Sequence, residues 1–268
     1  MGLFVVASAK GSPGVTTTAV VLAGAWPAEP VLADLDPAGG DVALRYRDEA
    51  GAPLDPDRGL LSLGAGVRRG SGEALLTDHV QRVSGGLQVL TGVSSPSQVQ
   101  GLGPAWLHLA RLLRSDPEGR DVIADCGRLM PGSATVPVLQ NADAVLMVAR
   151  PTVEGLAHLR ERLHSFAEVL QFGTYEAVPV GVALVASYRD GRVAGDVQSI
   201  LERSRLPVSV LGIVAEDEKA ADAIRLGDGY RARKSLLVRS GAELAERLFR
   251  LGRPAQSAQA QDSEWGVA

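Results

Sequence analysis

The sequence is poor in cysteine, in aromatic residues and in net charge, and each shortage excludes a class of protein. A single cysteine, Cys126, among 268 residues leaves no internal disulfide and no cysteine-rich metal centre. Aromatic residues make up only 4% of the chain, too few for a platform on which single-stranded nucleic acid stacks. The net charge of −4 gives no general attraction to nucleic acid or anionic lipid, so any such contact needs a local basic patch.

The N-terminal segment lacks the charge pattern of a secretion signal. Residues 1–9 are largely apolar and contain no basic residue, and the first charged side chain is Lys10. The run is far too short to span a membrane. Residues 241–251 predict an amphipathic helix with charges of both signs, which fits packing on a sheet better than lying on a membrane. We therefore expect a cytoplasmic protein with no direct membrane insertion.

Short apolar runs alternate with helical patterns along the chain. Each run is apolar throughout and does not alternate with polar residues, which is typical of strands in a parallel sheet covered on both faces. Strands are predicted at residues 3–9, 30–36, 86–90, 121–125, 144–149, 180–186 and 208–214. Helices are predicted at residues 16–25, 105–114, 153–170, 195–204, 217–226 and 241–251. This order predicts an α/β fold with a doubly wound, mostly parallel sheet and helices on both faces, in three α/β/α layers.

Length and composition predict one large domain. With 46% hydrophobic residues, the chain can form a single α/β domain around a substantial core. Residues 48–58 are polar, contain proline and predict a surface loop. Residues 253–268 show no apolar periodicity, so we expect a folded domain over residues 1–252 and a disordered polar tail after it.

A glycine-containing turn follows the first predicted strand and leads into an apolar helix. It reads Lys-Gly-Ser-Pro-Gly-Val-Thr-Thr over residues 10–17. Gly11 and Gly14 allow successive backbone N–H groups to point into one concave nest, and the following helix directs the positive end of its dipole at the same place. Thr16 and Thr17 add hydroxyl groups that can reach a metal ion and a phosphate. The turn therefore predicts a phosphate-binding loop.

This loop resembles the deviant Walker A motif of the ParA/MinD family of ATPases, which reads Lys-Gly-Gly-x-Gly-Lys-Thr-Thr. The resemblance implies a P-loop NTPase-like fold that binds ATP or ADP with Mg²⁺. The nucleotide-binding residues that it implies in this loop are Lys10, Gly11, Ser12, Pro13, Gly14, Val15, Thr16 and Thr17. Lys10 matches the family's signature lysine, a catalytic residue that reaches the nucleotide of the partner subunit in a homodimer. Thr16 matches the magnesium ligand, and Thr17 matches a phosphate contact.

Two positions of the loop depart from the motif. Ser12 replaces a glycine, which a negative φ at this position allows. Val15 replaces the lysine that grips the β- and γ-phosphates, so a positive charge is missing where charge is stabilised during phosphoryl transfer. A charge-assisted hydrogen bond of this kind contributes about 1.5–3 kcal/mol. We expect binding to survive on the nest, Mg²⁺ and Lys10, and hydrolysis to be weak or absent.

Acidic residues follow the second predicted strand in the run Asp-Leu-Asp-Pro-Ala-Gly-Gly-Asp, residues 34–41. The run resembles the family's switch segment. The resemblance implies that Asp34 is a catalytic residue that helps orient the attacking water, and that Asp36 supports the magnesium ion. Without the resemblance, such residues can simply cap a turn. Their place at a strand end that faces a phosphate loop favours a binding role, because such sheets bind ligands at their strand ends.

The fourth predicted strand ends in Asp-Cys-Gly, residues 125–127, which resembles the family's Walker B segment. The resemblance implies that Asp125 holds the magnesium ion, a hard cation that takes oxygen ligands. Cys126 is interpreted as a small buried hydrophobic residue. Further along, residues 211–217 resemble the segment beside the adenine base, which implies that Asp217 contacts the nucleotide. Residues 186–188 stand where the family often has an asparagine that reads adenine.

A basic cluster near the C-terminus has two interpretations. Its members are Arg225, Arg231, Arg233, Lys234 and Arg239. In ParA-type relatives a basic face of the dimer binds DNA without sequence preference, through phosphate contacts that salt weakens. A solvated helical face balanced by nearby acidic residues is the favoured interpretation, so non-specific DNA binding is not our first expectation.

Three hypotheses for function follow. The first is a ParA/MinD-like positioning, partitioning or regulatory protein that binds ATP or ADP with Mg²⁺, dimerises through the nucleotide and recruits a protein partner of unknown identity. The second is a pseudo-ATPase scaffold that binds no nucleotide and acts only as a protein-interaction module for secretion, pilus or cell-division machinery. The third is a working ATPase in which Lys10 alone neutralises the phosphate charge.

Overall fold

One sheet and its covering helices make up the fold in the computed structural model, which describes residues 1–11, 13–69, 75–188, 191–228 and 232–253. The strands are β1 (Leu3–Ser8), β2 (Val31–Asp34), β3 (Gln81–Arg82), β4 (Gln88–Leu90), β5 (Val122–Arg128), β6 (Ala144–Ala149), β7 (Val180–Ala186) and β8 (Val208–Ala215). The helices are α1 (Val15–Gly24), α2 (Val42–Arg45), α3 (Leu60–Arg68), α4 (Pro96–Leu102), α5 (Ala105–Arg114), α6 (Val136–Gln140), α7 (Val153–Ser165), α8 (Val193–Arg203), α9 (Glu218–Arg225) and α11 (Leu236–Leu251), with a 3₁₀ turn η1 (Leu76–His79).

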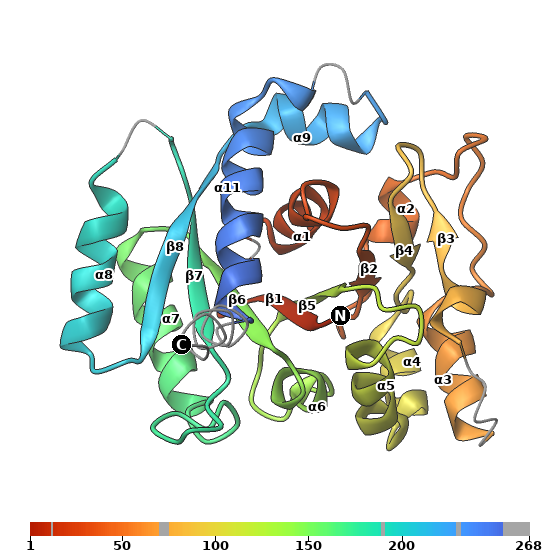
Figure 1. Cartoon of the computed structure of the whole chain (residues 1–268), viewed down its shortest axis with the longest axis horizontal. Helices are drawn as coiled ribbons and strands as arrows, with labels where there is room; N and C mark the ends of the chain where they lie inside the picture. The colour runs from red at the N-terminus through yellow and green to blue at the C-terminus, as the bar shows by residue number, and fades with distance from the viewer. Residues whose placement is uncertain (12, 70–74, 189–190, 229–231, 254–268) are drawn as a thin grey trace, which may run out of the picture.

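The sheet has the strand order β3-β4-β2-β5-β1-β6-β7-β8 and runs through the middle of the molecule in Figure 1. Its described pairings are parallel except that of β3 with β4. Every residue of β1 and β6, in the centre, is buried. Burial on both faces explains why these strands read as continuous apolar runs. The predicted mostly parallel, doubly wound sheet is confirmed.

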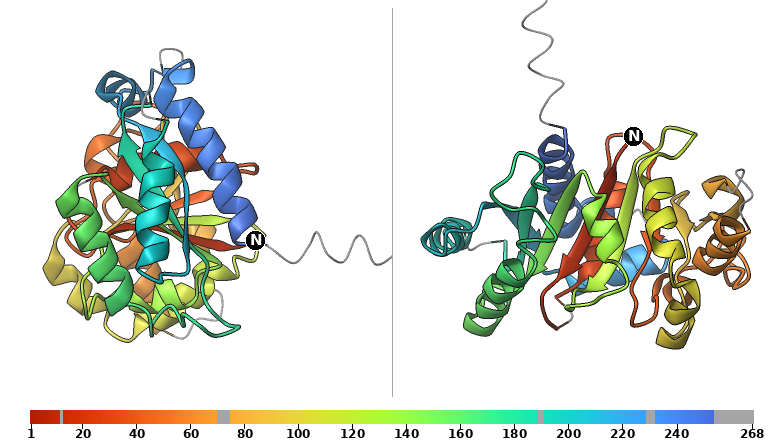
Figure 2. Two further views of the ribbon diagram at one scale, coloured as in Figure 1. Left: turned by 90° about the vertical axis from the view of Figure 1, so that its left-hand side faces the viewer. Right: turned by 90° about the horizontal axis from the view of Figure 1, so that it is seen from below.

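Helices cover both faces of the sheet, as Figure 1 and the turned views in Figure 2 show. α1, α9 and α11 pack on one face, around a core that includes Phe4, Leu22 and Leu248. α3, α5, α6, α7 and α8 pack on the other face, around a core that includes Leu63 and Leu109. In Figure 1, α1 and α11 lie above the sheet, and α5 and α6 lie below it. The predicted three-layer α/β/α arrangement is confirmed.

Short helices are the main difference from the sequence prediction. α2, α3, α4 and α6, which have between four and nine residues, were not predicted, because so few turns show no clear apolar periodicity. α7 ends at Ser165 rather than at residue 170, although the apolar side chains of Phe166 and Leu170 remain buried. α11 begins at Leu236 rather than at residue 241, because the Ser235 hydroxyl caps it by accepting the Val238 N–H at 3.2 Å.

The C-terminal end of α11 is tied back to the sheet through the residue that follows the predicted domain. Arg253 donates a hydrogen bond to Asp121 Oδ1 at 2.5 Å, and its guanidinium lies 4.3 Å from the centre of the Phe249 ring. The rest of the predicted tail, residues 254–268, lies outside the described residues. None of the helices in the described ranges is long and apolar enough to cross a bilayer.

Candidate functional site

The loop between β1 and α1 contains two glycines whose backbone conformation suits an anion-binding nest. Gly11 (φ +73°) and Gly14 (φ +95°) adopt the left-handed conformation, which residues with side chains rarely adopt. The Gly14 carbonyl accepts the Thr18 N–H at 2.8 Å, so α1 begins directly after the loop. The N–H groups of the first helical turn then have no acceptor within the helix and point out of its end. Ser12, a predicted binding residue, lies outside the described residues.

A cavity of about 550 Å³ lies in front of this loop, at the carboxyl ends of β1, β2 and β5. Its lining consists of Ser8, Gly11, Gly14, Val15, Thr16, Thr17, Asp36, Ala38, Asp41, Arg45, Gly127 and Arg128. We call it the loop cavity. The three sequence motifs meet here because β2, β5 and β1 are neighbours in the sheet and run in the same direction. Crevices at this edge are where open α/β sheets bind ligands.

Asp125 is fully buried near the end of β5, beside the loop cavity. Its Oδ1 accepts the Gly127 N–H at 3.0 Å, while its Oδ2 has no hydrogen-bond partner among the described residues. Burial raises the pKa of Asp125 to about 6, against the opposing effects of the Thr16 hydroxyl and the Gly127 N–H. A buried carboxylate oxygen without a partner is costly, so this position fits a bound cation.

Asp36 approaches the same place from the turn after β2. It is half-buried and lines the loop cavity, and its Oδ1 accepts the Ala38 N–H at 2.8 Å. Burial, with a smaller effect of the Asp41 charge, raises the pKa of Asp36. Gly127 (φ +57°) permits this approach, because a Cβ atom there would overlap the Asp36 carboxylate. The structure therefore brings together Asp36 and Asp125, two of the predicted metal ligands, and the charge of Asp36 acts on Asp125.

Asp34 is buried beside Asp125 and does not line the loop cavity. The two residues are partners in the register of β2 and β5, and Asp34 is 1% exposed. Its Oδ2 accepts the Val42 N–H at 3.1 Å, and Gly40 and Gly92 pack so closely on it that neither has room for a Cβ atom. Burial and the Asp125 charge raise the pKa of Asp34 to about 7. Asp34 thus holds the turn after β2 in this structure, and its contact with an attacking water stays a prediction.

Val15, which replaces the lysine of the motif, contributes an apolar wall. It is the first residue of α1 and is 7% exposed. Its side chain belongs to the same apolar core as Val6 and Leu22. The loop therefore lines the cavity with Gly11, Gly14, Thr16 and Thr17, and position 15 adds no cation.

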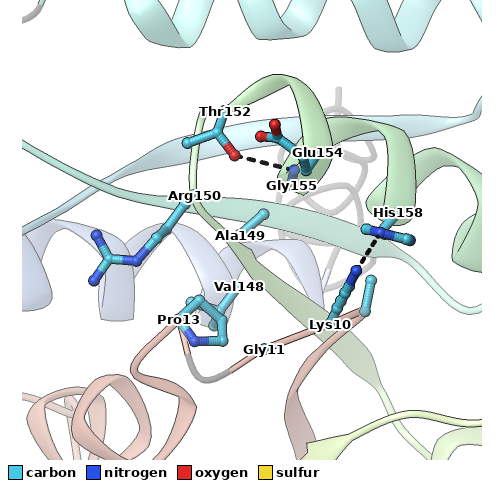
Figure 3. Close-up of a pocket in the computed structure, with 11 residues that line it drawn as sticks. Lys10, Gly11, Pro13, Val148, Ala149, Arg150, Thr152, Glu154, Gly155 and His158 are labelled. Carbon is cyan, nitrogen blue, oxygen red and sulfur yellow. Dashed lines mark hydrogen bonds between the residues drawn. The ribbon is translucent and has the colours of Figure 1, made fainter.

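Lys10 is turned toward α7. Its Nζ lies 2.8 Å from Nε2 of His158, as Figure 3 shows. Because an ammonium group only donates, His158 accepts through Nε2. The pair lines a second, smaller cavity of about 230 Å³, whose walls also include Pro13 and Arg150. Gly11 lines both cavities, so the loop lies between them.

Asp217, predicted to contact the nucleotide, caps α9. Its Oδ1 accepts the Ala220 N–H at 3.0 Å, and it is not among the described residues that line the loop cavity. The preceding residue, Glu216, pairs with Arg150 at 2.7 Å and so joins the ends of β8 and β6. The side chain of Asp217 therefore has a structural partner already.

The predicted basic cluster is mostly solvent-exposed in the part that the structure describes. Arg225 pairs with Asp222 at 2.5 Å, three residues before it in α9. Arg233, Lys234 and Arg239 are exposed, and Arg231 lies outside the described residues. The Arg225–Asp222 pair is the acidic balance that the solvated-face interpretation predicts, while exposure alone does not decide between the two interpretations.

Two arginines that the sequence analysis did not identify line the loop cavity. Arg45 is the last residue of α2 and pairs with Asp41, one turn before it. Arg128 follows Gly127 at the end of β5 and is exposed. The positive charge of Arg45 also opposes the rise in the pKa of Asp125. The sequence signal for Arg45 is its spacing of four from Asp41, just after the second motif, which is typical of a helical ion pair.

The acidic residues of the loop cavity fit Mg²⁺ better than a closed metal centre. Among the described residues, no three His, Cys, Asp or Glu side chains converge as a metal-binding group. Mg²⁺ keeps several water molecules and takes one or two carboxylates together with phosphate oxygens. Asp125 with its unpartnered Oδ2, Asp36 and the Thr16 hydroxyl form such a sparse, oxygen-only set.

Comparison by sequence gives no relative. No protein-family model matches the chain, and no curated protein matches it. Comparison by structure, in contrast, finds ATPases of the ParA and MinD kinds over nearly the whole chain.

Three of these solved structures show the likeness. The ParA family ATPase of Chlorobium tepidum TLS is 20% identical, with a TM-score of 0.68 over 91% of this chain and 98% of its own. The cell division ATPase MinD of Pyrococcus furiosus is 19% identical, with a TM-score of 0.70 over 94% and 100%. The septum site-determining protein MinD of Pyrococcus horikoshii OT3, complexed with Mg-ADP, is 16% identical, with a TM-score of 0.68 over 94% and 98%. The chain has the fold of the ParA/MinD ATPases.

Proposed function

We propose that this chain is a ParA/MinD-like positioning, partitioning or regulatory protein that binds ATP or ADP with Mg²⁺ in the loop cavity. The observation that carries the proposal is the meeting of the glycine nest, the α1 N-terminus and the buried Asp125 with its unpartnered Oδ2. The fold shared with a MinD structure complexed with Mg-ADP supports the same assignment.

Each part of the loop cavity has a binding role in this proposal. The N–H groups of Gly11, Gly14 and the first turn of α1 would donate hydrogen bonds to phosphate oxygens, helped by the helix dipole. The Thr17 hydroxyl would add one phosphate contact. Thr16, Asp36 and Asp125 would hold the metal ion. When bound, Mg²⁺ would neutralise part of the phosphate charge.

We propose that hydrolysis is weak or absent. Val15 supplies an apolar wall in place of a cation, and Lys10 is engaged by His158. Asp34, which we propose to orient the attacking water, is buried and accepts the Val42 N–H, so it is engaged as well. A site without a cation at position 15 binds the ground state through its backbone and stabilises the developing charge poorly.

We propose further that the nucleotide links two copies of the chain. Lys10 is exposed and at the rim of the smaller cavity, so it can leave His158 and reach the nucleotide of a partner copy. The homodimer would recruit a protein partner. The nucleotide-binding domain would span residues 1–252, with a polar tail after it. Non-specific DNA binding forms no part of the proposal.

A second candidate function is the pseudo-ATPase scaffold that binds no nucleotide. The observation that favours it is the burial of Val15 in the apolar core, which commits the start of α1 to packing. In that case the loop would be a strand-to-helix connection only. The unpartnered Oδ2 of Asp125 supports nucleotide binding with Mg²⁺ instead, because a bound cation stabilises a buried carboxylate oxygen.

Equilibrium binding of a fluorescent ATP analogue, with and without Mg²⁺, distinguishes nucleotide binding from the scaffold function. The wild type should bind with a micromolar Kd that depends on Mg²⁺, and Asp125→Asn should weaken that binding by about tenfold or more. Asp57→Asn, at an exposed position in the 48–58 loop, is the control for the loss of one negative charge. Melting curves would show that each variant is folded. If no variant and no wild-type protein binds at millimolar nucleotide, nucleotide binding is excluded and the pseudo-ATPase scaffold is the remaining candidate function.

A further inference from the structure

The loop cavity contains a cation that no sequence motif accounts for. Arg45, at the end of α2, lines the cavity with 36% of its side chain exposed. Asp41, one turn earlier, pairs with it and lines the same cavity. Arg45 therefore faces the space in front of the phosphate loop from a different element than the loop itself.

Negative side chains outnumber positive ones around the metal-binding end of the loop cavity. Three carboxylates, those of Asp36, Asp41 and Asp125, lie on or directly beside the cavity. Lys10, the cation of the motif, lines the other cavity and contacts His158. A nucleotide would add further negative charge. On the side of the cavity formed by the phosphate loop, only backbone N–H groups would balance the negative charge of the nucleotide, since Val15 carries no charge.

We propose that Arg45 supplies from α2 the phosphate-binding charge that Val15 removes from the loop. This inference rests on the proposed function, because it names the residue that contacts the terminal phosphate in the same cavity. A planar guanidinium suits a phosphate, since it can donate two parallel hydrogen bonds. Its charge already acts on the buried Asp125, which places it within electrostatic reach of the metal-binding end.

Asp41 is the resting partner of Arg45 in this proposal. The ion pair occupies the guanidinium in the absence of ligand. A phosphate would compete with Asp41 for it. Arg128 also lines the cavity, but it is exposed, whereas Arg45 is half-buried and is the arginine whose charge acts on Asp125.

The test is Mg²⁺-dependent binding of fluorescent ATP and ADP analogues to the wild type and Arg45→Gln. We expect the Kd for ATP to rise by about 10- to 100-fold in the variant, and the Kd for ADP to rise less. Arg47→Gln is the matched control. Arg47 lies two residues away and is exposed, and within the described part of the chain its side chain donates to the Leu44 and Tyr46 carbonyls. We expect Arg47→Gln to change the Kd by less than about twofold.

Two further variants separate phosphate binding from a structural role. Asp41→Asn frees the guanidinium and removes a negative charge, so it should tighten ATP binding while Arg45→Gln weakens it. If Arg45 only holds α2 through Asp41, both variants should weaken binding equally. Adding Val15→Lys to Arg45→Gln should restore most of the lost affinity, because it returns a cation to the loop side of the same cavity.

The outcomes distinguish this inference from the proposed function. If the wild type binds and Arg45→Gln binds equally well, the role of Arg45 is overturned and nucleotide binding stands. Equal losses in Arg45→Gln and Asp41→Asn also overturn it. If the wild type binds neither nucleotide at millimolar concentration, the proposed function fails, and the role of Arg45 fails with it.

Discussion

Two buried carboxyl groups lie side by side at the base of the site. Asp34 and Asp125 face each other in the register of β2 and β5, and burial raises the pKa of both, to about 7 and about 6. Only Asp125 has an oxygen without a partner, whereas Asp34 accepts the Val42 N–H. The same residue type therefore has two roles here, one structural and one suited to a metal ion, and the surroundings decide which.

The raised pKa of Asp34 predicts how stability depends on pH. A carboxyl group whose pKa is about 7 when folded, against an ordinary value of 3.8, binds its proton more tightly in the folded state. Its stabilising contribution is therefore complete below about pH 4 and is lost as the pH rises toward 7. Without Mg²⁺, the melting temperature of the wild type should fall between pH 5 and pH 8 more steeply than that of Asp34→Asn.

Thermal melts of both proteins across this pH range check the prediction, with Asp57→Asn as the control for a lost surface charge. At pH 8 Asp34→Asn should melt several degrees higher than the wild type, because it removes a buried negative charge beside Asp125. Identical slopes for the wild type and Asp34→Asn would show that Asp34 does not titrate in this range.

At the scale of elements, the loop after β1 is held against α7 by one described side-chain contact. Lys10 donates to His158, and the two residues are 148 positions apart in the chain. No local pattern in the sequence links them, because the contact arises only when β6, which pairs with β1, brings the following helix α7 beside it. In the proposed dimer, Lys10 must give up this contact before it reaches the partner's nucleotide.

Replacement of His158 should therefore favour dimerisation. His158→Ala removes the acceptor that competes for Lys10, so the nucleotide-dependent dimer should form at a lower protein concentration than in the wild type. Sedimentation velocity with Mg²⁺ and ATP measures this. His164→Ala, at an exposed position of the same helix, should leave the dimer unchanged. A dimer weakened by His158→Ala would mean that His158 supports the active position of Lys10.

At the scale of the whole molecule, the sheet order is what assembles the site. The central strands could be predicted because burial on both faces leaves continuous apolar runs in the sequence. Their parallel direction then placed the three motifs at one edge, and Asp36, Asp125 and the loop do meet there. The predicted fold and the predicted convergence of these motifs both follow from this one pattern.

The rest of the site depended on short elements and tertiary contacts. α2, only four residues long, has no periodicity of its own, yet it carries Arg45 to the cavity. The burial of Asp34 follows from the close approach of Gly40 and Gly92. These two glycines are far apart in the sequence and meet at Asp34 only in the folded chain. The sequence could place Asp34 near the site, but it could not predict whether the side chain is buried or faces the cavity.

The central claim is that the loop cavity binds a nucleotide with Mg²⁺, and a crystal structure of the chain grown with saturating Mg²⁺ and ADP tests it most directly. The account predicts the diphosphate on the N–H groups of Gly14 and the first turn of α1, and the metal ion beside Thr16 and Asp125. An empty loop cavity at millimolar Mg²⁺ and ADP, or a nucleotide bound elsewhere on the chain, would contradict it.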